Sequence, residues 1–305
     1  MLTHELNAAQ IAARKMVCLP LDELSTLHEI AERVKELSPY VGLFKIGKES
    51  FTRFGDEAVK LVHDSGAEVF LDLKYHDIPN TVGGASDAAT EKTICMFNIH
   101  ASGGREMIRK AVQAAQQASN KYSVNKPKLI GVTVLTSIGP AEYLDINRIL
   151  VPKLSFDDLK PYYNMKTTDA ELQTKFAGML FHKGYANLIT ETKDGLRSNV
   201  IEQQVLNLGK MMANEGGDGI VCSAADLQYI TKELPPDFTF VTPGIMGPNT
   251  PAGADQRRVA TPGNAVEDGA SILVIGRAIT GGKTPEERQQ AAYDVLQDIA
   301  PKIKV

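Results

Sequence analysis

Short apolar runs recur along the chain, and longer stretches with apolar residues three or four positions apart separate them. The runs do not alternate cleanly with polar residues, which is typical of parallel strands that are buried on both faces. We therefore interpret the runs as strands of a parallel sheet. The eight candidate strands are Met16–Leu21, Leu43–Ile46, Val69–Leu73, Met96–His100, Leu129–Leu135, Gly219–Ser223, Phe240–Pro243 and Ile272–Gly276.

The stretches between these runs have the spacing of amphipathic helices. After the first run, the apolar residues between Leu27 and Leu37 fall on one helical face, with Ser25 as the expected N-cap and Glu29 in the first turns. Gly66 is expected to end the helix after the second run. Eight strands that alternate with helices predict an α/β fold, a (β/α)8 TIM barrel. A doubly wound open sheet is the alternative, but the glycine-rich nucleotide turn that it usually carries is not seen in the sequence.

One segment, residues 139–198 between the fifth and sixth strands, interrupts this rhythm. It shows no strand pattern at the expected spacing, and it is too long for a bare loop in a compact domain. Its apolar residues, among them Leu144, Ile149 and Phe176, argue against disorder. We predict a partly helical insertion, serving as a lid, a dimer element or a decoration, within a single barrel domain that spans residues 1–305.

The composition is that of an ordinary globular protein of 305 residues, of which 43% are hydrophobic and 23% charged. A formal net charge of −4, without a basic cluster, gives no reason to expect nucleic acid as a partner. No stretch approaches the roughly 18 apolar residues of a membrane span, and the N-terminus does not resemble a signal peptide. The three cysteines lack the spacing of a metal site or disulfide framework, which fits a reducing compartment, so we expect a cytoplasmic protein.

Charged residues close the third predicted strand, in the stretch VFLDLKYHDIPNTV at residues 69–82. Charges at the end of a buried strand are costly unless they are paired or used. Asp72 and Lys74 face the same side of an extended segment, Lys45 lies on the neighbouring strand, and Asp77 follows in the loop. Together they predict an alternating network of lysine and aspartate without net charge. Such a network indicates either an active site or a structural ion-pair cluster at the barrel rim.

The last two strands run into segments that contain glycine, TPGIMGPNT after the seventh and GR after the eighth. Loops at these positions often form a phosphate site in this fold. Gly244 and Gly276 would let the backbone approach an anion. Arg277 offers a fork of donors for phosphate oxygens, and Gln256 lies in the long loop after the seventh strand. The sequence therefore predicts that this end of the barrel binds phosphate.

Two histidines near the acidic residues raise the alternative of a metal site. His76 and His100 could act as ligands together with Asp72 or Asp77. Lys74 would then have to share the pocket with a cation, which is electrostatically unfavourable. We therefore predict a site without a metal ion.

The segment FLDLKYHDIPNTV resembles the active-site signature of the orotidine 5'-phosphate decarboxylases, Asp-x-Lys-x-x-Asp followed by Ile-Pro-Asn-Thr. Other segments resemble this family in the same order, over about residues 17–137 and 200–300. The resemblance implies a phosphate-binding barrel that forms homodimers and uses no cofactor. It also implies conversion of orotidine 5'-monophosphate to uridine 5'-monophosphate and CO2, the last step of de novo pyrimidine biosynthesis. The further matching segments are LFKIGKESFTRFG, NIHASGGREM, GVTVLTS, GIVCSA, VTPGI, ADQRRVATP and LVIGRAIT.

Matched motif to motif, the resemblance implies a role for each charged residue. Lys74 would protonate C6 of the pyrimidine as CO2 leaves, and Asp72 would lie against the substrate carboxylate. Lys45 would bind the ribose and orient Asp72. Asp77 would reach into the active site of the partner subunit, with Thr81 nearby.

The resemblance also implies a set of substrate-binding residues. Asp22 would bind a ribose hydroxyl, and Thr136 and Ser137 would meet the edge of the pyrimidine. Met246 stands where bacterial members often carry arginine, so phosphate binding would depend on the remaining ligands. The implied phosphate ligands are Gln256, Gly276 and Arg277.

Two other functions are alternatives to the decarboxylase. A sister enzyme on the same scaffold, a sugar-phosphate decarboxylase or aldolase, would use the same Asp-x-Lys-x-x-Asp motif with Mg²⁺, although the segments IPNT and ADQRR argue against it. A non-catalytic binding protein or assembly module would bind a nucleotide without turning it over. The complete set of Lys45, Asp72, Lys74 and Asp77 argues against that second alternative.

Overall fold

The computed structural model describes residues 4–165, 169–192, 195–248 and 260–303. The chain forms two compact units. The first comprises Met1–Thr133, Leu208–Pro251 and Val259–Val305, and the second comprises Val134–Asn207 and Ala252–Arg258. Helix α10 (Val200–Asn214) begins in the second unit and ends in the first.

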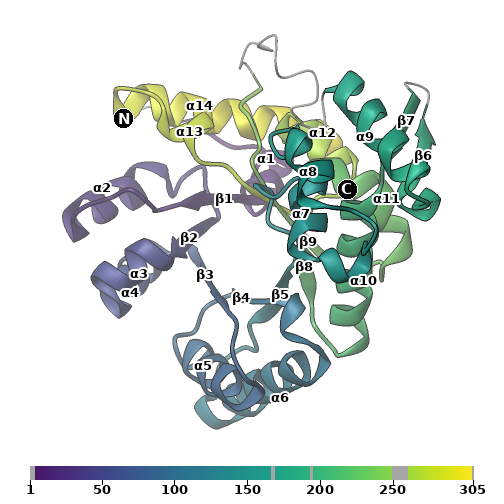
Figure 1. Cartoon of the computed structure of the whole chain (residues 1–305). Helices are drawn as coiled ribbons and strands as arrows, with labels where there is room; N and C mark the ends of the chain where they lie inside the picture. Colours follow the sequence, from purple (N-terminus) through teal and green to yellow (C-terminus); the bar gives the residue numbers. More distant parts are fainter. Residues whose placement is uncertain (1–3, 166–168, 193–194, 249–259, 304–305) are drawn as a thin grey trace. The chain divides into compact units, whose positions relative to one another are not determined.

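The first unit contains a closed barrel of parallel strands in the order β1-β10-β9-β8-β5-β4-β3-β2 (Figure 1). The strand β1 pairs with both β2 and β10, so the alternative of an open sheet is wrong and the (β/α)8 barrel is confirmed. All eight predicted strands are present in the described part of the chain. They are β1 (Val17–Pro20), β2 (Leu43–Gly47), β3 (Glu68–Tyr75), β4 (Met96–His100), β5 (Lys128–Val132), β8 (Gly219–Val221), β9 (Thr239–Pro243) and β10 (Ile272–Val274).

The interior of the barrel holds a layer of apolar side chains, each from a different strand. The register aligns Cys18 with Leu43 and Phe70 with Met96, so these side chains reach the same level. Burial of this layer explains why the strands are apolar without alternation, since both faces of a barrel strand are covered. The layer consists of Cys18, Leu43, Phe70, Met96, Ile130 and Val241.

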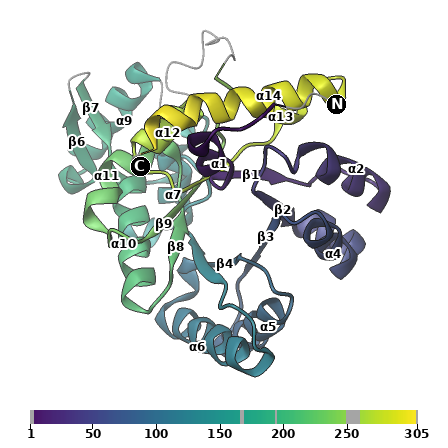
Figure 2. The same ribbon diagram turned by 180° about the vertical axis from the view of Figure 1, so that it is seen from behind.

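Helices connect the barrel strands and lie on the outside of the sheet (Figure 2). Within the described ranges, none of the helices is both long enough and apolar enough to cross a bilayer. The helices of this unit are α1 (Ala8–Arg14), α2 (Leu27–Leu37), α3 (Lys48–Phe54), α4 (Asp56–Asp64), α5 (Pro79–Glu91), η1 (Ala101–Gly103), α6 (Arg105–Tyr122), α11 (Ala224–Ile230), η5 (Thr231–Glu233), α12 (Pro262–Glu267), α13 (Arg277–Thr280), α14 (Pro285–Ile299) and η6 (Ala300–Lys302).

The start of α2 differs by one residue from the prediction. Thr26, not Ser25, is the N-cap: its side chain accepts the N–H of Glu29 at 3.1 Å, and the Glu29 carboxylate accepts the N–H of Thr26 at 3.0 Å. This reciprocal pair is a capping box, in which the two residues are three positions apart. Thr26 has that spacing from Glu29, whereas Ser25 lies four positions before it. Gly66 follows α4 with a φ of +74°, as expected for a glycine that ends a helix.

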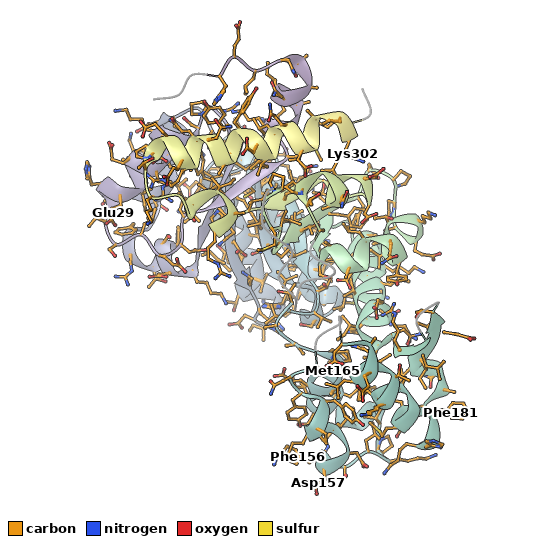
Figure 3. The ribbon with its side chains drawn as sticks, turned by 90° about the horizontal axis from the view of Figure 1, so that it is seen from above. Glu29, Phe156, Asp157, Met165, Phe181 and Lys302 are labelled. Atoms are coloured by element: carbon orange, nitrogen blue, oxygen red, sulfur yellow. The ribbon has the colours of Figure 1, made fainter. Side chains whose placement is uncertain are left out.

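The second unit contains the predicted insertion and has a hydrophobic core of its own. Its helical content confirms the partly helical prediction, and Phe156 and Phe181 lie exposed at its surface (Figure 3). The helices are α7 (Pro140–Ile146), η2 (Arg148–Leu150), α8 (Phe156–Leu159), η3 (Lys160–Tyr162), α9 (Ala170–His182) and η4 (Ala186–Leu188). The core consists of Ala141, Leu144, Val151, Leu154, Leu159, Met165, Phe176, Leu180 and Val200.

The second unit also contains an antiparallel pair of strands that the sequence did not predict, β6 (Ile189–Thr192) and β7 (Gly195–Ser198). Their register aligns Ile189 with Ser198 and Thr192 with Gly195. Both strands are short, largely polar and only partly buried, so they lack the apolar run that marked the barrel strands.

Candidate active site

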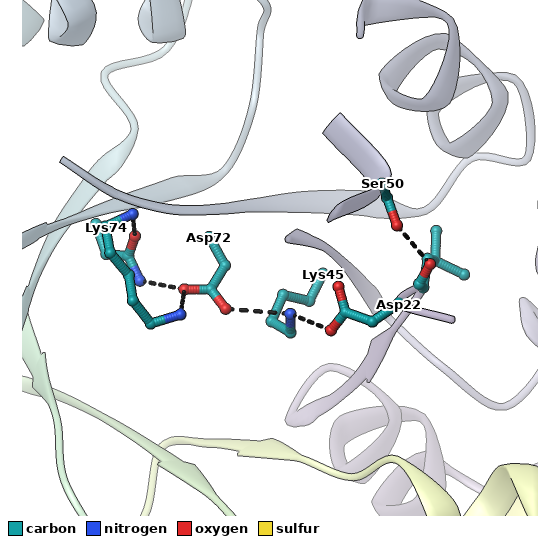
Figure 4. Close-up of polar contacts among 7 residues, drawn as sticks. Asp22, Lys45, Ser50, Asp72 and Lys74 are labelled. Carbon is teal, nitrogen blue, oxygen red and sulfur yellow. Dashed lines mark hydrogen bonds and ion pairs between the residues drawn. The ribbon is translucent and has the colours of Figure 1, made fainter. Parts of the chain in front are cut away.

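A line of alternating charges crosses the carboxyl ends of β1, β2 and β3 (Figure 4). Asp22 Oδ2 lies 2.6 Å from Lys45 Nζ, and Lys45 Nζ lies 3.1 Å from Asp72 Oδ2. The other oxygen of Asp72, Oδ1, lies 2.6 Å from Lys74 Nζ. The structure thus brings four of the predicted site residues into one array that carries no net charge.

The array is buried at its centre, where Lys45 and Asp72 are 8% and 7% exposed. At about 3 Å and an effective dielectric constant of about 20, two unit charges attract by about 5 kcal/mol. Desolvation costs several kcal/mol for each ion, so attraction and desolvation nearly cancel. Net stability therefore does not explain why these charges are buried, which favours a role in binding or catalysis.

The neighbouring charges decide the ionisation of the two buried groups. Burial alone would raise the pKa of Asp72, but the ammonium groups of Lys45 and Lys74, with hydrogen bonds from Lys74 and Asn98, hold it below its usual range. Burial would lower the pKa of Lys45, but Asp72 and Asp22 outweigh that effect and raise it. Both groups are therefore charged at neutral pH.

Lys74 sits in an irregular part of β3. The register pairs Leu71 with Phe97 and Tyr75 with Ile99, so β3 advances four residues while β4 advances two. Lys74 has a φ of +52°, in the left-handed region, which costs a non-glycine residue about 1–2 kcal/mol. Bulges next to active sites re-aim a side chain, and here the affected residue is the predicted proton donor.

Asn98 on β4 is a member of the array that sequence reasoning missed. Its side-chain Nδ2 donates to Asp72 Oδ1 at 2.6 Å, and its Oδ1 accepts the backbone N–H of Lys74 at 2.7 Å. The residue is fully buried. The signal was a single polar residue inside the apolar run MFNIH, which is too weak to show a role without the fold.

Gly47 and Ser50 support the other end of the array and were also missed. A Cβ added to Gly47 would overlap Asp22 Oδ1 and lie 2.9 Å from Lys45 Nζ, so any other residue would force this ion pair to change its present geometry. The buried hydroxyl of Ser50 donates to the carbonyl oxygen of Leu21 at 2.6 Å, which ties α3 to the residue before Asp22 (Figure 4). Both belong to the segment KIGKES, which begins with Lys45.

Asp77 lies apart from the array within this chain. The sequence suggested it as the fourth charge after Lys74, but Asp22 takes that place beyond Lys45. Asp77 is exposed, its carboxylate accepts the N–H of Ile78 at 2.6 Å, and it makes no ion pair with any residue that the structure describes. Thr81 is exposed in the first turn of α5. Chain direction explains the difference, because the loop after β3 leads outward into α5.

The predicted phosphate residues lie at the ends of β9 and β10. The register pairs Val274 with Pro243, so Gly276 and Gly244 follow on adjacent strands. Gly244 has a φ of +75°, which favours glycine. Arg277 is exposed and follows Gly276 directly. Gln256 lies outside the described residues.

The predicted pyrimidine contacts, Thr136 and Ser137, belong to the second unit. Both are exposed, in the segment between β5 and α7. Their exposed hydroxyls follow a barrel strand and are accessible to a ligand. The contact with the pyrimidine stays a prediction.

The histidine pair lies beside the array. The rings of His76 and His100 are 5.2 Å apart between centroids. Burial lowers the pKa of His100, and His76, Lys48 and Lys74 lower it further. In the part of the chain that the structure describes, no three His, Cys, Asp or Glu side chains are grouped as metal ligands. The carboxylates of Asp22 and Asp72 both face the ammonium group of Lys45, which lies between them.

A closed (β/α)8 barrel with a buried lysine–aspartate array at its carboxyl ends has the architecture of a barrel enzyme, in which the active site lies at that end. The model of the orotidine 5'-phosphate decarboxylase / HUMPS family matches residues 15–157 and 182–292. The chain belongs to this family. The part of the insertion between residues 158 and 181 lies outside the match.

Individual relatives agree with the family match. An orotidine 5'-phosphate decarboxylase of Syntrophus aciditrophicus is 35% identical over 280 residues, which cover 92% of this chain and 91% of the relative. Another, of Pseudoalteromonas translucida, is 38% identical over 252 residues, covering 83% and 85%. The crystal structure of orotidine 5'-phosphate decarboxylase from Lactobacillus acidophilus aligns with a TM-score of 0.62 and 29% identity over 93% of this chain and 98% of that one.

Proposed function

We propose that this protein decarboxylates orotidine 5'-monophosphate to uridine 5'-monophosphate and CO2, as a carboxy-lyase of pyrimidine biosynthesis. One observation carries the proposal: the Lys74 ammonium is held 2.6 Å from a buried, ionised Asp72 carboxylate at the end of a barrel strand. This pair provides a fixed positive charge and a proton donor next to a fixed negative charge. Decarboxylation of a pyrimidine carboxylate leaves a carbanion, which needs a positive charge to stabilise it and a donor to protonate it.

The reaction begins with cleavage of the bond between C6 and the carboxylate carbon. CO2 leaves without the bonding electrons, which remain at C6 as a carbanion. The Lys74 ammonium stabilises this charge and then donates its proton to C6, which leaves a neutral amine. Asp72 next to the substrate carboxylate disfavours the bound substrate, and loss of CO2 relieves that repulsion.

The remaining residues bind the substrate away from the reacting carbon. Asp22 and Lys45 bind the ribose, and Thr136 and Ser137 contact the pyrimidine edge. Gln256, Gly276 and Arg277 hold the phosphate. Binding energy from these contacts offsets the unfavourable approach of two carboxylates at C6, so remote contacts increase the rate.

We also propose a cytoplasmic homodimer in which Asp77 and Thr81 complete the site of the partner subunit. The exposed position of both residues, and the lack of an ion pair for Asp77 among the described residues, support this role. A mixture of Lys74→Ala and Asp77→Asn subunits tests it, because a mixed dimer would contain one intact site. Recovery of activity on mixing is expected; two inactive variants that stay inactive together after subunit exchange would refute shared sites.

An ultraviolet assay tests the reaction itself. Purified protein is incubated with orotidine 5'-monophosphate in EDTA, and loss of the orotate chromophore is followed. Rapid loss with uridine 5'-monophosphate as product is expected. Activity only on a sugar phosphate, and only after Mg²⁺ is restored, would instead identify the sister enzyme. Nucleotide binding without turnover would identify a binding protein.

A further inference from the structure

Asn98 makes contact with both halves of the proposed catalytic pair. Its amide nitrogen donates to the Asp72 carboxylate and its amide oxygen accepts from the backbone of Lys74. The side chain is fully buried on β4, the strand next to β3. A buried amide that uses its donor for one residue and its acceptor for another fixes their relative position.

The contact to Lys74 lies where β3 is irregular. Between the pairs Leu71–Phe97 and Tyr75–Ile99, the backbone N–H of Lys74 bonds to the Asn98 side chain. A buried N–H without a partner is costly, so this bond compensates for the break in the ladder. It also holds Lys74 in the left-handed conformation that directs its side chain toward Asp72.

The contact to Asp72 sets the orientation of the carboxylate. Oδ1 accepts from Asn98 and from Lys74 Nζ, both at 2.6 Å, while Oδ2 faces Lys45 Nζ at 3.1 Å. The two lysine side chains can rotate, but the Asn98 amide is short, buried and carried by a barrel strand. Of the three donors to the Asp72 carboxylate, Asn98 is therefore the one with the least freedom to move, and it fixes the orientation of the carboxylate.

We propose that Asn98 is a positioning residue for the decarboxylation, which sets the Lys74 ammonium at C6 through both the backbone and the Asp72 carboxylate. This inference rests on the proposed function and adds a residue to its site. A positioning role predicts a loss in kcat with little change in KM, because Asn98 touches the donor pair and not the remote contacts that bind substrate.

Asn98→Asp is the decisive variant. It keeps the shape and the acceptor for Lys74 but replaces the donor by a carboxylate oxygen facing Asp72. Two carboxylates this close share a proton at low pH, and the shared proton restores a donor to Asp72. At higher pH the proton is lost and the two oxygens repel. The charged groups facing this position are Asp72 and Lys74 from β3, with Lys45 behind Asp72, whereas the residue paired with Asn98 on β5 is the apolar Ile130.

We expect kcat of Asn98→Asp to fall at least tenfold with rising pH through an ionisation that the wild type lacks, with KM within about threefold. Since His76 and His100 are present in both proteins, the wild-type profile serves as the baseline. Asn98→Ala should lower kcat about 100-fold at all pH values, as expected for a misplacement of about 1 Å. The matched control is Thr133→Val, which removes another buried bond at a strand end, from Thr133 Oγ1 to the carbonyl oxygen of Val221 at 2.7 Å, outside the array. It should keep kcat within about threefold.

Steady-state kinetics between pH 5 and 9 (roughly the range over which a shared carboxylate proton is lost) give the result. The positioning role is overturned if the wild type turns over substrate and the pH profile of kcat in Asn98→Asp runs parallel to that of the wild type. An unchanged kcat in Asn98→Ala would overturn it as well. If Asn98→Ala does not fold, the pH profile of the isosteric Asn98→Asp decides alone. A wild-type protein without turnover would overturn the proposed function instead.

Discussion

The close approach at Gly47 gives a prediction that follows from distances alone. Gly47 has an extended backbone, with φ −86° and ψ −177°, so alanine is tolerated there by the main chain. Its added Cβ would lie 2.9 Å from Lys45 Nζ, whereas ordinary contact begins at 3.4 Å, and it would overlap Asp22 Oδ1. The lysine must retreat by about 0.5 Å, and the Asp22 carboxylate must move further.

We expect Gly47→Ala to lower kcat/KM by about 100-fold, the size of effect that a displacement of about 1 Å produces. That factor corresponds to about 2.7 kcal/mol of transition-state stabilisation. Stability should change much less. The Asp22 side chain is 36% exposed and can turn toward solvent, and such partly exposed pairs contribute only about 0–1 kcal/mol.

The assay compares the initial rate of chromophore loss with the thermal melting of the same preparation. The control is Gly178→Ala, because Gly178 lies in α9, outside the array, and an added Cβ there has no atom within 4 Å beyond its chain neighbours and the helix backbone. Alanine there should leave kcat/KM unchanged and add up to about 1 kcal/mol of stability through its helix propensity. If Gly47→Ala keeps kcat/KM within threefold of Gly178→Ala, the spacing between Asp22 and Lys45 does not matter to the reaction.

Three further predictions concern the charges themselves. In the proposed mechanism, Lys74→Ala removes both the electrostatic stabiliser and the acid, so it should fold and bind uridine 5'-monophosphate but lose turnover by at least about 10⁴-fold. Its control is Lys60→Ala at an exposed lysine, and equal turnover in the two variants would contradict the role of Lys74. Arg277→Ala should raise KM by about tenfold or more while leaving uridine binding intact, so isothermal titration with uridine and its monophosphate separates a phosphate contact from general damage. The folded pKa of Asp72 lies below its unfolded value of about 3.9, so its stabilisation is complete above that pH and is lost as pH falls through the folded pKa. Urea unfolding at descending pH should show this loss in the wild type and not in Asp72→Asn. The pKa of Lys45 is raised, so the stabilisation that Lys45 contributes is lost at the other end of the scale, as pH rises through its folded pKa, above the unfolded value of about 10.4.

The sequence predicted the parts of this molecule that have a local chemical signal. The barrel strands were visible because burial on both faces makes them apolar, and the charges at the end of β3 stood out against that background. The chain order of strands and helices then predicted the barrel. The same logic missed β6 and β7, because these strands are largely polar and only partly buried and so lack that contrast.

Residues that act through three-dimensional proximity were beyond the reach of the sequence. Gly47 matters because of the side chains it leaves room for, and Asn98 because a bulge in one strand brings a backbone N–H to its amide. The sequence spacing of Asp77 suggested a place in the array that Asp22 occupies. Spacing along one strand shows which face a residue shares, but it does not show where the following loop leads.

The unequal exposure of Lys74 and Asp72 has a consequence for the fate of the proton. The Lys74 side chain is 29% exposed, whereas that of Asp72 is 9% exposed. In the proposed mechanism, each turnover transfers one proton from Lys74 to carbon. Water that reaches the amine can replace that proton while the carboxylate stays covered. The proposed mechanism therefore predicts that the hydrogen at C6 of the product originates in the solvent, through the lysine, and that turnover in D2O labels that single carbon position.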